Sequence, residues 1–531
     1  MKRFSILLVA LILIGGAVLW QHNDVSVTTV QVTAHQASIY DELTGRAIMT
    51  VPQGFSFMTT TPCDAYCYGV IGNRSVRIAT QHVSVETTEQ QHETSATTDE
   101  TVTTLYDAAL YASMDNNGEQ VATVHVGVTL TLLQSYEEWV AVELFGQMLY
   151  MERQQLNERK QHVTLVTVTD ETPLYLEATE QQVIATAAAG TQLVVTRHDK
   201  MHYVVRIGET EAFMRHSAGE LREESIRLAL KKEATAHIIV SKNTAAAVNE
   251  GHAITLLPQF RYPIVAMTET HYVLSLGGQL AHVERAYAAL DVGMPALVYH
   301  HILPEHALGD YKHASSTVTT TAFEQQMHYL HVAGFQTLTA EEARRYMDGH
   351  ITARQAVIVT FDDGLLSTKE YAYDVLKRYH MTALQHIISA RKDRTTSMQQ
   401  FDATAPLQFL NDDEMAQMAD VFSYEAHTFN LHILDEERHV SRLMLANAGE
   451  LRDDLRQNLE DVPTATTFAY PFGQYKPQTI EVLQELGFAL AFTTTPGYST
   501  VSDSPYTLKR FTPTQQTTLE QFERYVNGFG L

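Results

Sequence analysis

Two adjacent carboxylates, Asp362 and Asp363, stand where an apolar run ends. The run, residues 357–361, is rich in β-branched side chains and has the composition of a buried strand. Like charges side by side are costly unless a cation or a shared proton relieves them. The carboxyl end of a strand is also where barrels and open α/β folds place their chemistry. Because Gly364 follows, an Asp-Gly turn without any function would explain the same residues.

Two histidines, His427 and His432, follow a second expected strand, residues 423–426. Together with an aspartate from another strand end, two imidazoles make a set of three ligands. Three protein ligands with an open position are typical of a catalytic metal site rather than a structural one. Two nitrogen ligands and one oxygen ligand suit zinc, and cobalt or nickel could occupy the same set. Combined with the paired carboxylates, the histidines therefore predict a metal centre.

Two further motifs sit at strand ends. Tyr470, Pro471, Phe472 and Gly473 end one strand as aromatic-Pro-aromatic-Gly, which predicts a rigid wall with exposed backbone N–H groups. Such a wall could line a sugar site or an oxyanion pocket, and packing against the barrel explains its aromatic rings equally well. His300 follows another apolar segment, which would deliver it to the same end of the fold.

Strand and helix patterns alternate from Pro295 to the C-terminus. Strands are expected at 296–299, 336–338, 356–361, 383–388, 423–426, 466–470, 488–493 and 508–511, and helices at 323–333, 369–379, 411–419, 435–457 and 478–486. Such alternation predicts parallel strands covered by helices. We expect a (β/α) barrel over residues 295–531, incomplete or distorted.

Residues 295 to about 525 resemble the metal-dependent polysaccharide deacetylases of carbohydrate esterase family 4. Residues 360–364, Thr-Phe-Asp-Asp-Gly, match the first motif of that family residue for residue. The resemblance implies that Asp362 is the general base and Asp363 a metal ligand. It also implies hydrolysis of the acetamide of N-acetylglucosamine units in a cell-wall or biofilm polysaccharide, with release of acetate.

The resemblance implies that His427 and His432 are the other two ligands. These histidines are five residues apart, whereas four is the commonest spacing in the family. The longer spacing, with Tyr299-His300 at the start of the domain, is similar to the biofilm-type branch that acts on poly-β-1,6-N-acetylglucosamine. In that branch the general acid comes from the first strand, which implies His300.

The sequence departs from the family pattern at two places. The usual arginine before Pro-aromatic-Gly is missing, and the late Leu-x-His motif is replaced by Leu508-Lys509-Arg510. Arg510 could supply the missing guanidinium beside Asp362. Two other functions therefore stay open: a wall-binding scaffold with a degenerate barrel, and an O-acetyl esterase acting on acetylated glycans.

The N-terminal half has short alternating segments and turn residues typical of all-β structure. Its pattern repeats and resembles bacterial SH3-like domains in four copies, at 27–85, 105–156, 160–222 and 226–288. A Thr/Glu/Gln-rich linker, residues 86–104, is expected to separate the first copy from the others. Binding of cell-wall glycan or peptide would suit the copies, and a simple spacer role would suit them too.

The N-terminus has the pattern of a targeting segment. Within residues 1–24, Lys2 and Arg3 precede an apolar run, as in an export signal. The run is near the lower limit for spanning a bilayer, so an uncleaved membrane anchor or a cleaved signal peptide is expected, with the body outside the cell. A formal net charge of -25 argues against nucleic acid as a partner. Cys63 and Cys67 could bridge a tight turn or remain thiols.

Overall fold

The structure, a computed structural model, describes most of the chain beyond residue 24. The described residues are 25–42, 47–59, 61, 63–71, 74–90, 101–104, 107–114, 120–125, 128–136, 138–153, 158–229, 233–249, 252–267, 270–276, 279–395 and 397–528. The signal or anchor expected over residues 1–24 lies outside them. In the described part, no helix combines the length and the apolar character needed to span a membrane. The chain divides into two compact units, of which the first consists mainly of residues up to His162.

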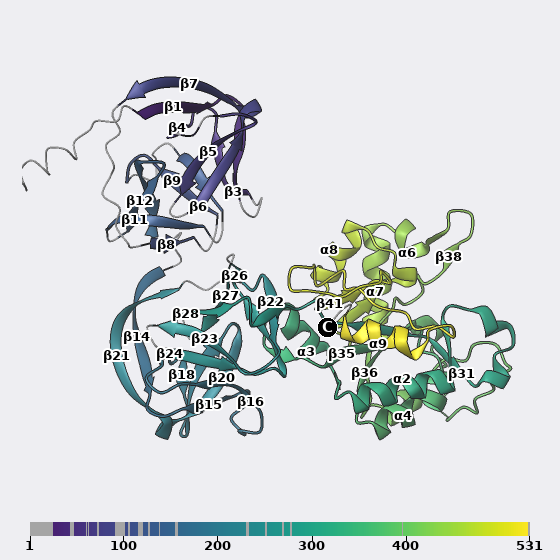
Figure 1. Cartoon of the computed structure of the whole chain (residues 1–531). Helices are drawn as coiled ribbons and strands as arrows, with labels where there is room; N and C mark the ends of the chain where they lie inside the picture. The colour runs from purple at the N-terminus through teal and green to yellow at the C-terminus, as the bar shows by residue number, and fades with distance from the viewer. Residues whose placement is uncertain are drawn as a thin grey trace, which may run out of the picture. The chain divides into compact units, whose positions relative to one another are not determined.

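The first unit is all-β and joins two of the expected copies. Its strands are β1 (Val25–Val32), β2 (Gln36–Asp41), β3 (Ala47–Pro52), β4 (Ser56–Thr59), β5 (Tyr66–Ile71), β6 (Arg74–Ala79), β7 (Val83–Gln90), β8 (Thr101–Thr103), β9 (Ala108–Tyr111), β10 (Gln120–Val124), β11 (Thr129–Ser135), β12 (Trp139–Leu144) and β13 (Gln147–Glu152). Strand β3 of the first copy pairs with β10 of the second, so one sheet runs through both (Figure 1). Alternating apolar side chains from both copies, such as Met49 and Val124, fill a single core.

Part of the segment expected to be a linker forms strands instead. Residues as far as Gln90 continue β7, which pairs with β1 along its length, and residues 101–103 form β8. The linker expected over residues 86–104 is therefore too long at both ends. Its threonines favour extended backbone, and a strand that faces solvent needs few apolar residues. The expected separation of the first copy from the other three is also wrong, because the first two copies share a sheet and a core.

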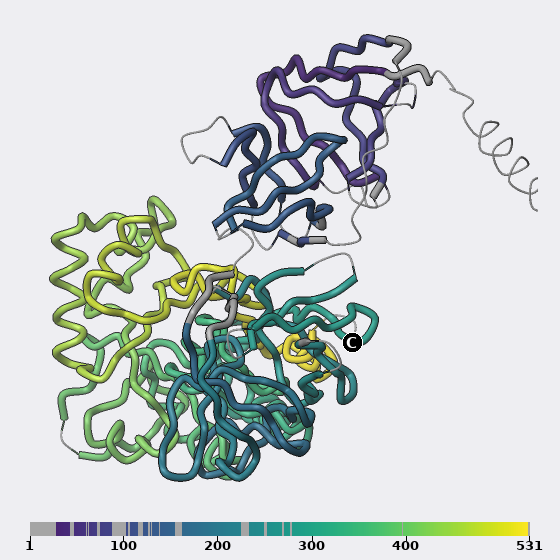
Figure 2. The backbone as a smooth tube through the Cα atoms, turned by 90° about the vertical axis from the view of Figure 1, so that its left-hand side faces the viewer, coloured from purple at the N-terminus to yellow at the C-terminus, as the bar shows by residue number. Residues whose placement is uncertain are grey.

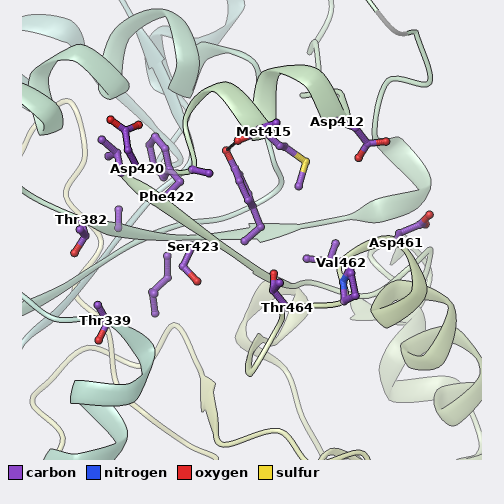
Figure 3. Close-up of a pocket in the computed structure, with 17 residues that line it drawn as sticks. Thr339, Thr382, Asp412, Met415, Asp420, Phe422, Ser423, Asp461, Val462 and Thr464 are labelled. Carbon is purple, nitrogen blue, oxygen red and sulfur yellow. Dashed lines mark hydrogen bonds between the residues drawn. The ribbon is translucent and has the colours of Figure 1, made fainter.

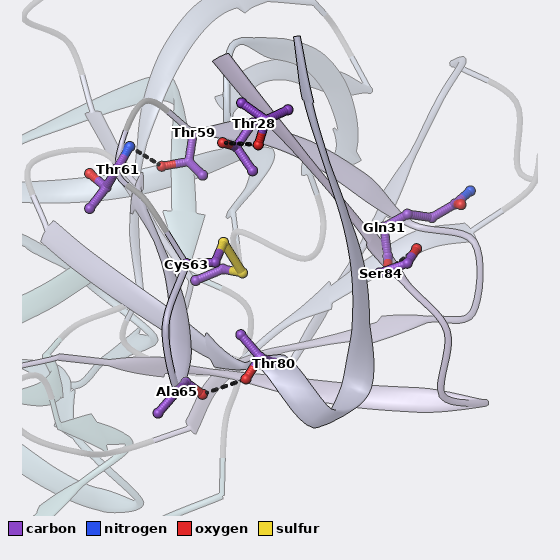
Figure 4. Close-up of a disulfide and its surroundings, with 10 residues drawn as sticks. Thr28, Gln31, Thr59, Thr61, Cys63, Ala65, Thr80 and Ser84 are labelled. Carbon is purple, nitrogen blue, oxygen red and sulfur yellow. Dashed lines mark hydrogen bonds between the residues drawn. A yellow bond between two sulfur atoms is a disulfide. The ribbon is translucent and has the colours of Figure 1, made fainter. Parts of the chain in front are cut away.

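The two cysteines form a disulfide at the turn between β4 and β5. Cys63 is bonded to Cys67, and Cys67 is fully buried in the core of the first unit (Figure 4). Beside them, the Thr80 hydroxyl donates a hydrogen bond to the Ala65 carbonyl at 3.0 Å. Of the two states that the sequence left open, the structure has the bridged turn.

The third and fourth copies open the second unit and are joined in the same way. Their strands are β14 (Glu158–Val168), β15 (Thr172–Tyr175), β16 (Val183–Ala187), β17 (Gln192–Val194), β18 (Arg197–His198), β19 (His202–Ile207), β20 (Thr210–Arg215), β21 (Gly219–Ala229), β22 (Ala236–Val240), β23 (Thr244–Asn249), β24 (His252–Leu256), β25 (Phe260–Ile264), β26 (Ala266–Met267), β27 (His271–Leu276), β28 (Gln279–Glu284) and β29 (Ala288–Leu290). Strand β16 pairs antiparallel with β24, the strands that correspond to β3 and β10. The all-β class is confirmed, whereas the SH3-like identity of the copies stays a prediction.

The fourth copy is fused to the C-terminal domain through a shared sheet. Strand β25 pairs with β34 (Thr352–Ala353), which belongs to the C-terminal domain. Nearby, Arg261 and Asp291 form a buried ion pair with an N–O distance of 3.0 Å. The His237 ring stacks on Tyr346, with ring centroids 4.6 Å apart. The expected boundary between residues 288 and 295 is therefore a change of fold and not a flexible joint.

The C-terminal domain is a barrel of parallel strands (Figure 1). Strands β30 (Ala296–Tyr299), β35 (Ala356–Phe361), β36 (Ala383–Ile387), β37 (Phe422–Ala426), β40 (Thr467–Ala469) and β41 (Leu490–Phe492) follow one another around it, and β33 (Gln336–Thr337) pairs with β35. Isolated parallel bridges, Phe492↔Leu508 and Leu297↔Phe511, join the last strand to the first. The expected strand 508–511 is thus reduced to bridges, and the closure is distorted. Two small sheets, β31 (His301–Leu303) with β32 (Thr317–Thr319) and β38 (Leu434–Asp435) with β39 (Val440–Ser441), lie outside the barrel path.

Helices cover the barrel, and Figure 2 shows the green and lime ones along its flank. They are α2 (Thr320–Val332), α3 (Ala340–Met347), α4 (Tyr373–Arg378), α5 (Asp412–Gln417), α6 (Arg442–Leu445), α7 (Ala448–Asp461), α8 (Pro477–Glu485) and α9 (Leu519–Asn527). The expected helix 435–457 is wrong over its first third, where β38 and β39 form a hairpin. A new helix begins after Asn447, whose side chain accepts from the N–H of Glu450 while Glu450 bonds back to the Asn447 N–H.

Candidate active site

Asp362 and Asp363 directly follow β35, at the carboxyl end of the barrel strands. Asp363 has a φ of 73°, a left-handed conformation that is rare for a residue with a side chain. Gly364 also has a positive φ, of 76°, and a Cβ there would lie 2.9 Å from the Ile387 side chain. The sharp turn sends the two carboxylates in different directions, and only glycine fits behind them.

Asp363, His427 and His432 converge on one point. Asp363 Oδ1 lies 3.6 Å from His427 Nε2 and 3.6 Å from His432 Nε2. The three ligand atoms all lie within 4.8 Å of one another, and Asp363 Oδ1 is buried without a hydrogen-bond partner. The Ala469 carbonyl lies 2.7 Å from His427 Nδ1, which leaves the lone pair of Nε2 facing Asp363. These donors fit a divalent cation.

The electrostatics of the site favour the charged form of Asp363 and the neutral form of His432, the forms in which these two groups can bind a metal. Burial alone would raise the pKa of Asp363, but the neighbouring imidazoles, led by His427, lower it to about 2. Burial, followed by the nearby His427, lowers the pKa of His432 to about 3. At neutral pH Asp363 is thus a carboxylate and His432 a neutral imidazole.

Helix α7 holds the loop that carries both histidines. The buried Asn458 amide donates to the carbonyl of Thr428 at 2.7 Å and to that of Ile387 at 3.1 Å. Asp454, one helical turn earlier, accepts from the backbone N–H groups of Phe429 and Asn430, both at 2.8 Å. Sequence reasoning missed these two residues. Their signal was a pair of polar residues four apart on the inner face of a helix.

Arg510 places a guanidinium beside Asp362, although the usual arginine of the family pattern is missing from this sequence. Its Nη1 and Nη2 atoms donate to the two carboxylate oxygens at 2.9 and 2.8 Å. It also donates to the Thr360 hydroxyl and the Thr493 carbonyl, so the side chain is held from three directions. Asp362 is 2% exposed and Arg510 0%. Burial alone would raise the pKa of Asp362, but Arg510 and then His386 hold it well below its usual range.

His300 lies just beyond β30, half-buried, and its Nδ1 atom is enclosed without a partner. It interacts electrostatically with Asp363. Its neighbour His301, which sequence reasoning did not single out, is buried with Nδ1 2.8 Å from Ser367 Oγ. Burial lowers the pKa of His301 to about 4, and Asp363 partly opposes this. The structure therefore brings His300, which follows β30, and His301, the first residue of β31, near Asp363.

The aromatic-Pro-aromatic-Gly segment splits between core and site. Tyr470 is fully buried, and its hydroxyl donates to the Tyr506 carbonyl at 2.9 Å, so its expected role at the substrate is wrong. Phe472 is 43% exposed with a φ of 56°, and its ring lies 4.5 Å from that of His432. Gly473 has a φ of 71°, and a Cβ there would lie 2.1 Å from Thr494 Oγ1. Pro471 is buried beneath this turn.

A pocket of about 590 Å³ lies at the other end of the barrel strands (Figure 3). It is lined where β36 and β37 begin, by residues such as Ala383 and Phe422, whereas Asp363, His427 and His432 follow the ends of strands. Its carboxylates already have cationic partners: Asp412 pairs with Lys392, Asp420 with Lys377 and Asp461 with Arg394. We therefore place the chemistry at the carboxyl ends and not in this pocket.

Comparison with known proteins finds relatives of the C-terminal domain. Residues 350–491 match the family model "Polysaccharide deacetylase". YxkH of Bacillus subtilis, named as a polysaccharide deacetylase, is 28% identical over 222 residues, 41% of this chain and 70% of its own length. The poly-beta-1,6-N-acetyl-D-glucosamine N-deacetylase of Staphylococcus epidermidis is 24% identical over 211 residues, 37% of this chain and 71% of that protein. The solved structure of IcaB from Ammonifex degensii is 25% identical, with a TM-score of 0.38 over 45% of this chain and 98% of that one.

The C-terminal domain of this chain belongs to the polysaccharide deacetylase family. Its relatives confirm the biofilm-type branch that the histidine spacing indicated.

Proposed function

We propose that the protein is an extracellular, metal-dependent N-deacetylase that removes acetate from N-acetylglucosamine units of a cell-wall or biofilm polysaccharide. The observation that carries the proposal is the convergence of Asp363, His427 and His432 next to a carboxylate, Asp362, that is held by Arg510 and not by the metal ligands. The staphylococcal relative is named for action on poly-beta-1,6-N-acetyl-D-glucosamine, and a polymer of this class is the substrate that we propose.

Asp363, His427 and His432 would hold the divalent ion, with zinc the best match to two nitrogens and one oxygen, and cobalt or nickel as substitutes. When bound, such an ion lowers the pKa of water towards ~7 and polarises a carbonyl oxygen. The residues themselves supply the remaining steps. Their orientation is set before substrate arrives, because α7 and the Ala469 carbonyl already fix the histidine loop.

Asp362 is the general base that we propose. Its carboxylate is ionised at every pH that a cell meets, because Arg510 lowers its pKa so far. An ionised carboxylate can accept the proton of the attacking water at Oδ2 while the guanidinium keeps the group in place. Asn at this position would keep the shape and lose the proton acceptor.

His300 is the general acid that we propose, because its Nδ1 is enclosed without a partner near Asp363 and can carry a proton to the leaving amine. The backbone N–H of Phe472 is the oxyanion donor that we propose. The next N–H, of Gly473, already donates to the Tyr470 carbonyl at 2.8 Å. The exposed Phe472 ring beside His432 offers a face on which a sugar can stack.

For the rest of the chain we propose that the four β-copies, as SH3-like domains, contact cell-wall glycan or peptide. Their attachment in pairs would present two joined surfaces to a polymer, which favours avidity over single-site affinity. We also propose that residues 1–24 anchor the protein to the membrane or are removed during secretion, which leaves the catalytic domain outside the cell.

The experiment is a measurement of acetate release from N-acetylated and O-acetylated glycans by the purified full chain, metal-free and after addition of zinc, cobalt or nickel. We expect release from an N-acetylglucosamine polymer only with metal. Acetate release from O-acetylated glycans alone would contradict the proposed N-deacetylase and indicate an O-acetyl esterase. Stoichiometric metal binding without release from any glycan would leave a binding protein with an inactive barrel.

A further inference from the structure

His386 is a buried histidine that the steps above do not use. It lies in β36 and is fully enclosed, with its ring centroid 5.6 Å from that of Phe492. A polar ring in such surroundings is costly to bury unless its nitrogens find partners. The identity of those partners indicates what the ring does.

Each ring nitrogen of His386 faces one group. Nε2 lies 3.1 Å from the Thr467 hydroxyl, and Nδ1 lies 3.2 Å from Asp362 Oδ1. The Nδ1 contact falls short of full hydrogen-bond alignment, and no other group in the described chain is a partner for Nδ1. Long contacts of this kind are common at catalytic groups before substrate binds, and they tighten in the productive complex.

Thr467 is itself fixed, which makes the histidine a rigid support. Its backbone N–H donates to the buried Glu425 carboxylate at 2.7 Å, and the N–H of Thr466 donates to the same oxygen at 2.8 Å. The line of contacts from Asp362 through His386 to Thr467 therefore runs from β35 through β36 to β40, all of them strands of the barrel wall.

The acceptor positions of Asp362 show why a third donor matters. A carboxylate has about four such positions on its two oxygens. Oδ1 accepts from Arg510 Nη1 and faces His386 Nδ1, while Oδ2 accepts from Arg510 Nη2. One position, on Oδ2, is left for the proton of water. The Arg510 guanidinium contacts both oxygens of Asp362 from one side. A second donor from another strand, His386 Nδ1, therefore limits rotation of the carboxylate relative to the guanidinium.

We propose that His386 is a positioning residue for the general base: its Nδ1–H holds Oδ1 of Asp362 so that the remaining lone pair of Oδ2 points at the reacting water. The inference rests on the proposed role of Asp362 as base. It depends on the direction of one N–H and not on the charge of the ring, because neutral and cationic imidazole can both donate from Nδ1.

The test compares His386→Leu, His386→Asn and His386→Gln in the full chain loaded with zinc. The amide N–H of Asn occupies the place of Nδ1, whereas the longer Gln side chain places its donor near Nε2. We expect His386→Leu and His386→Gln to lower kcat for acetate release roughly 10- to 100-fold, with KM and bound zinc unchanged. His386→Asn should remain within a few-fold of wild type. His328→Leu, an exposed histidine on α2, serves as the control without effect.

Wild-type kcat in the Leu variant, or equal kcat in the Asn and Gln variants, overturns the inference. If the Leu variant does not fold, as judged by its thermal unfolding midpoint, the comparison of Asn with Gln carries the test alone. A purely structural role would lower the midpoint of all three variants without separating Asn from Gln in kcat. Failure of the proposed function is distinct, because the wild-type protein would then release no acetate.

Discussion

Replacing Arg510 by methionine probes the base most directly. The guanidinium is wholly buried and bonds both oxygens of Asp362, at 2.9 and 2.8 Å. Removing one partner of a buried ion pair costs about 3–5 kcal/mol, because the other charge is left uncompensated. We expect Arg510→Met to lower the free energy of unfolding at neutral pH by about this amount, measured by urea denaturation.

The same substitution changes how stability and activity depend on pH. Burial raises the pKa of Asp362, and Arg510 outweighs it, so the folded pKa lies well below the ordinary value of 3.8. The carboxylate therefore stabilises the wild type above pH ~4, and this contribution is lost as the pH falls through the folded pKa. Without Arg510, burial prevails and the folded pKa rises. The variant should lose stability as the pH rises, and the acid limb of its kcat/KM profile should move to higher pH.

Arg394→Met is the matched control for this prediction. Arg394 pairs with Asp461 at 3.2 Å, but its side chain is 55% exposed. Exposed pairs contribute about 0–1 kcal/mol, so this variant should unfold almost like wild type and keep its pH profile. A loss below about 1 kcal/mol in Arg510→Met, together with an unmoved acid limb, would refute the pairing as we describe it.

Three other outcomes are expected. Asp362→Asn should keep stoichiometric zinc and lose turnover, whereas His427→Ala should lose both, which elemental analysis beside the acetate assay checks. Burial lowers the pKa of His237 from 6.5 to about 4, so the unfolded chain takes up the proton first. The contribution of neutral His237 to the free energy of unfolding is fully present above pH 6.5 and falls by about 3 kcal/mol as the pH drops towards 4. Urea unfolding of His237→Phe should therefore show a smaller loss of stability between pH 6.5 and pH 4 than wild type. Asn458→Ala removes the hydrogen bonds that the Asn458 amide donates to Ile387, Ser389 and Thr428 behind the histidine loop. We expect it to weaken zinc binding roughly 10- to 100-fold in a competition titration. Unchanged zinc affinity would show that the loop keeps its conformation without Asn458.

Some features of the fold were beyond what sequence pattern could show. The apolar spacing of residues 435–457 suits a helix, but the structure interrupts it with a hairpin and restarts the helix at a cap. The polar segment 86–104 was expected to be a linker because it has little to bury, yet β1 supplies backbone partners to its residues as far as Gln90. In both cases a contact from elsewhere in the chain decided the local structure.

The three candidate metal ligands were predictable because they stand in the segments that follow two expected strands, Asp363 after β35 and both histidines after β37. Parallel strands bring their carboxyl ends together, so Asp363, His427 and His432 needed only the strand pattern and their own chemistry to be singled out. Tyr470 shows the limit of that argument. A residue at a strand end can face the core as readily as the site, and alternation over a three-residue strand cannot tell which.

The amino-acid sequence by itself determined the class of the catalytic domain, its parallel strands and the three residues that meet at its mouth. Only the tertiary structure decided what surrounds Asp362. Arg510 lies 148 positions from Asp362 along the chain, and His386 lies 24 positions from it. Arg510 was a candidate from the sequence, because it stands where the family pattern has a late motif, but only the structure established its contact with Asp362. His386 has no local signal, because the direction of a buried side chain is set by barrel closure and by the neighbours that it meets there.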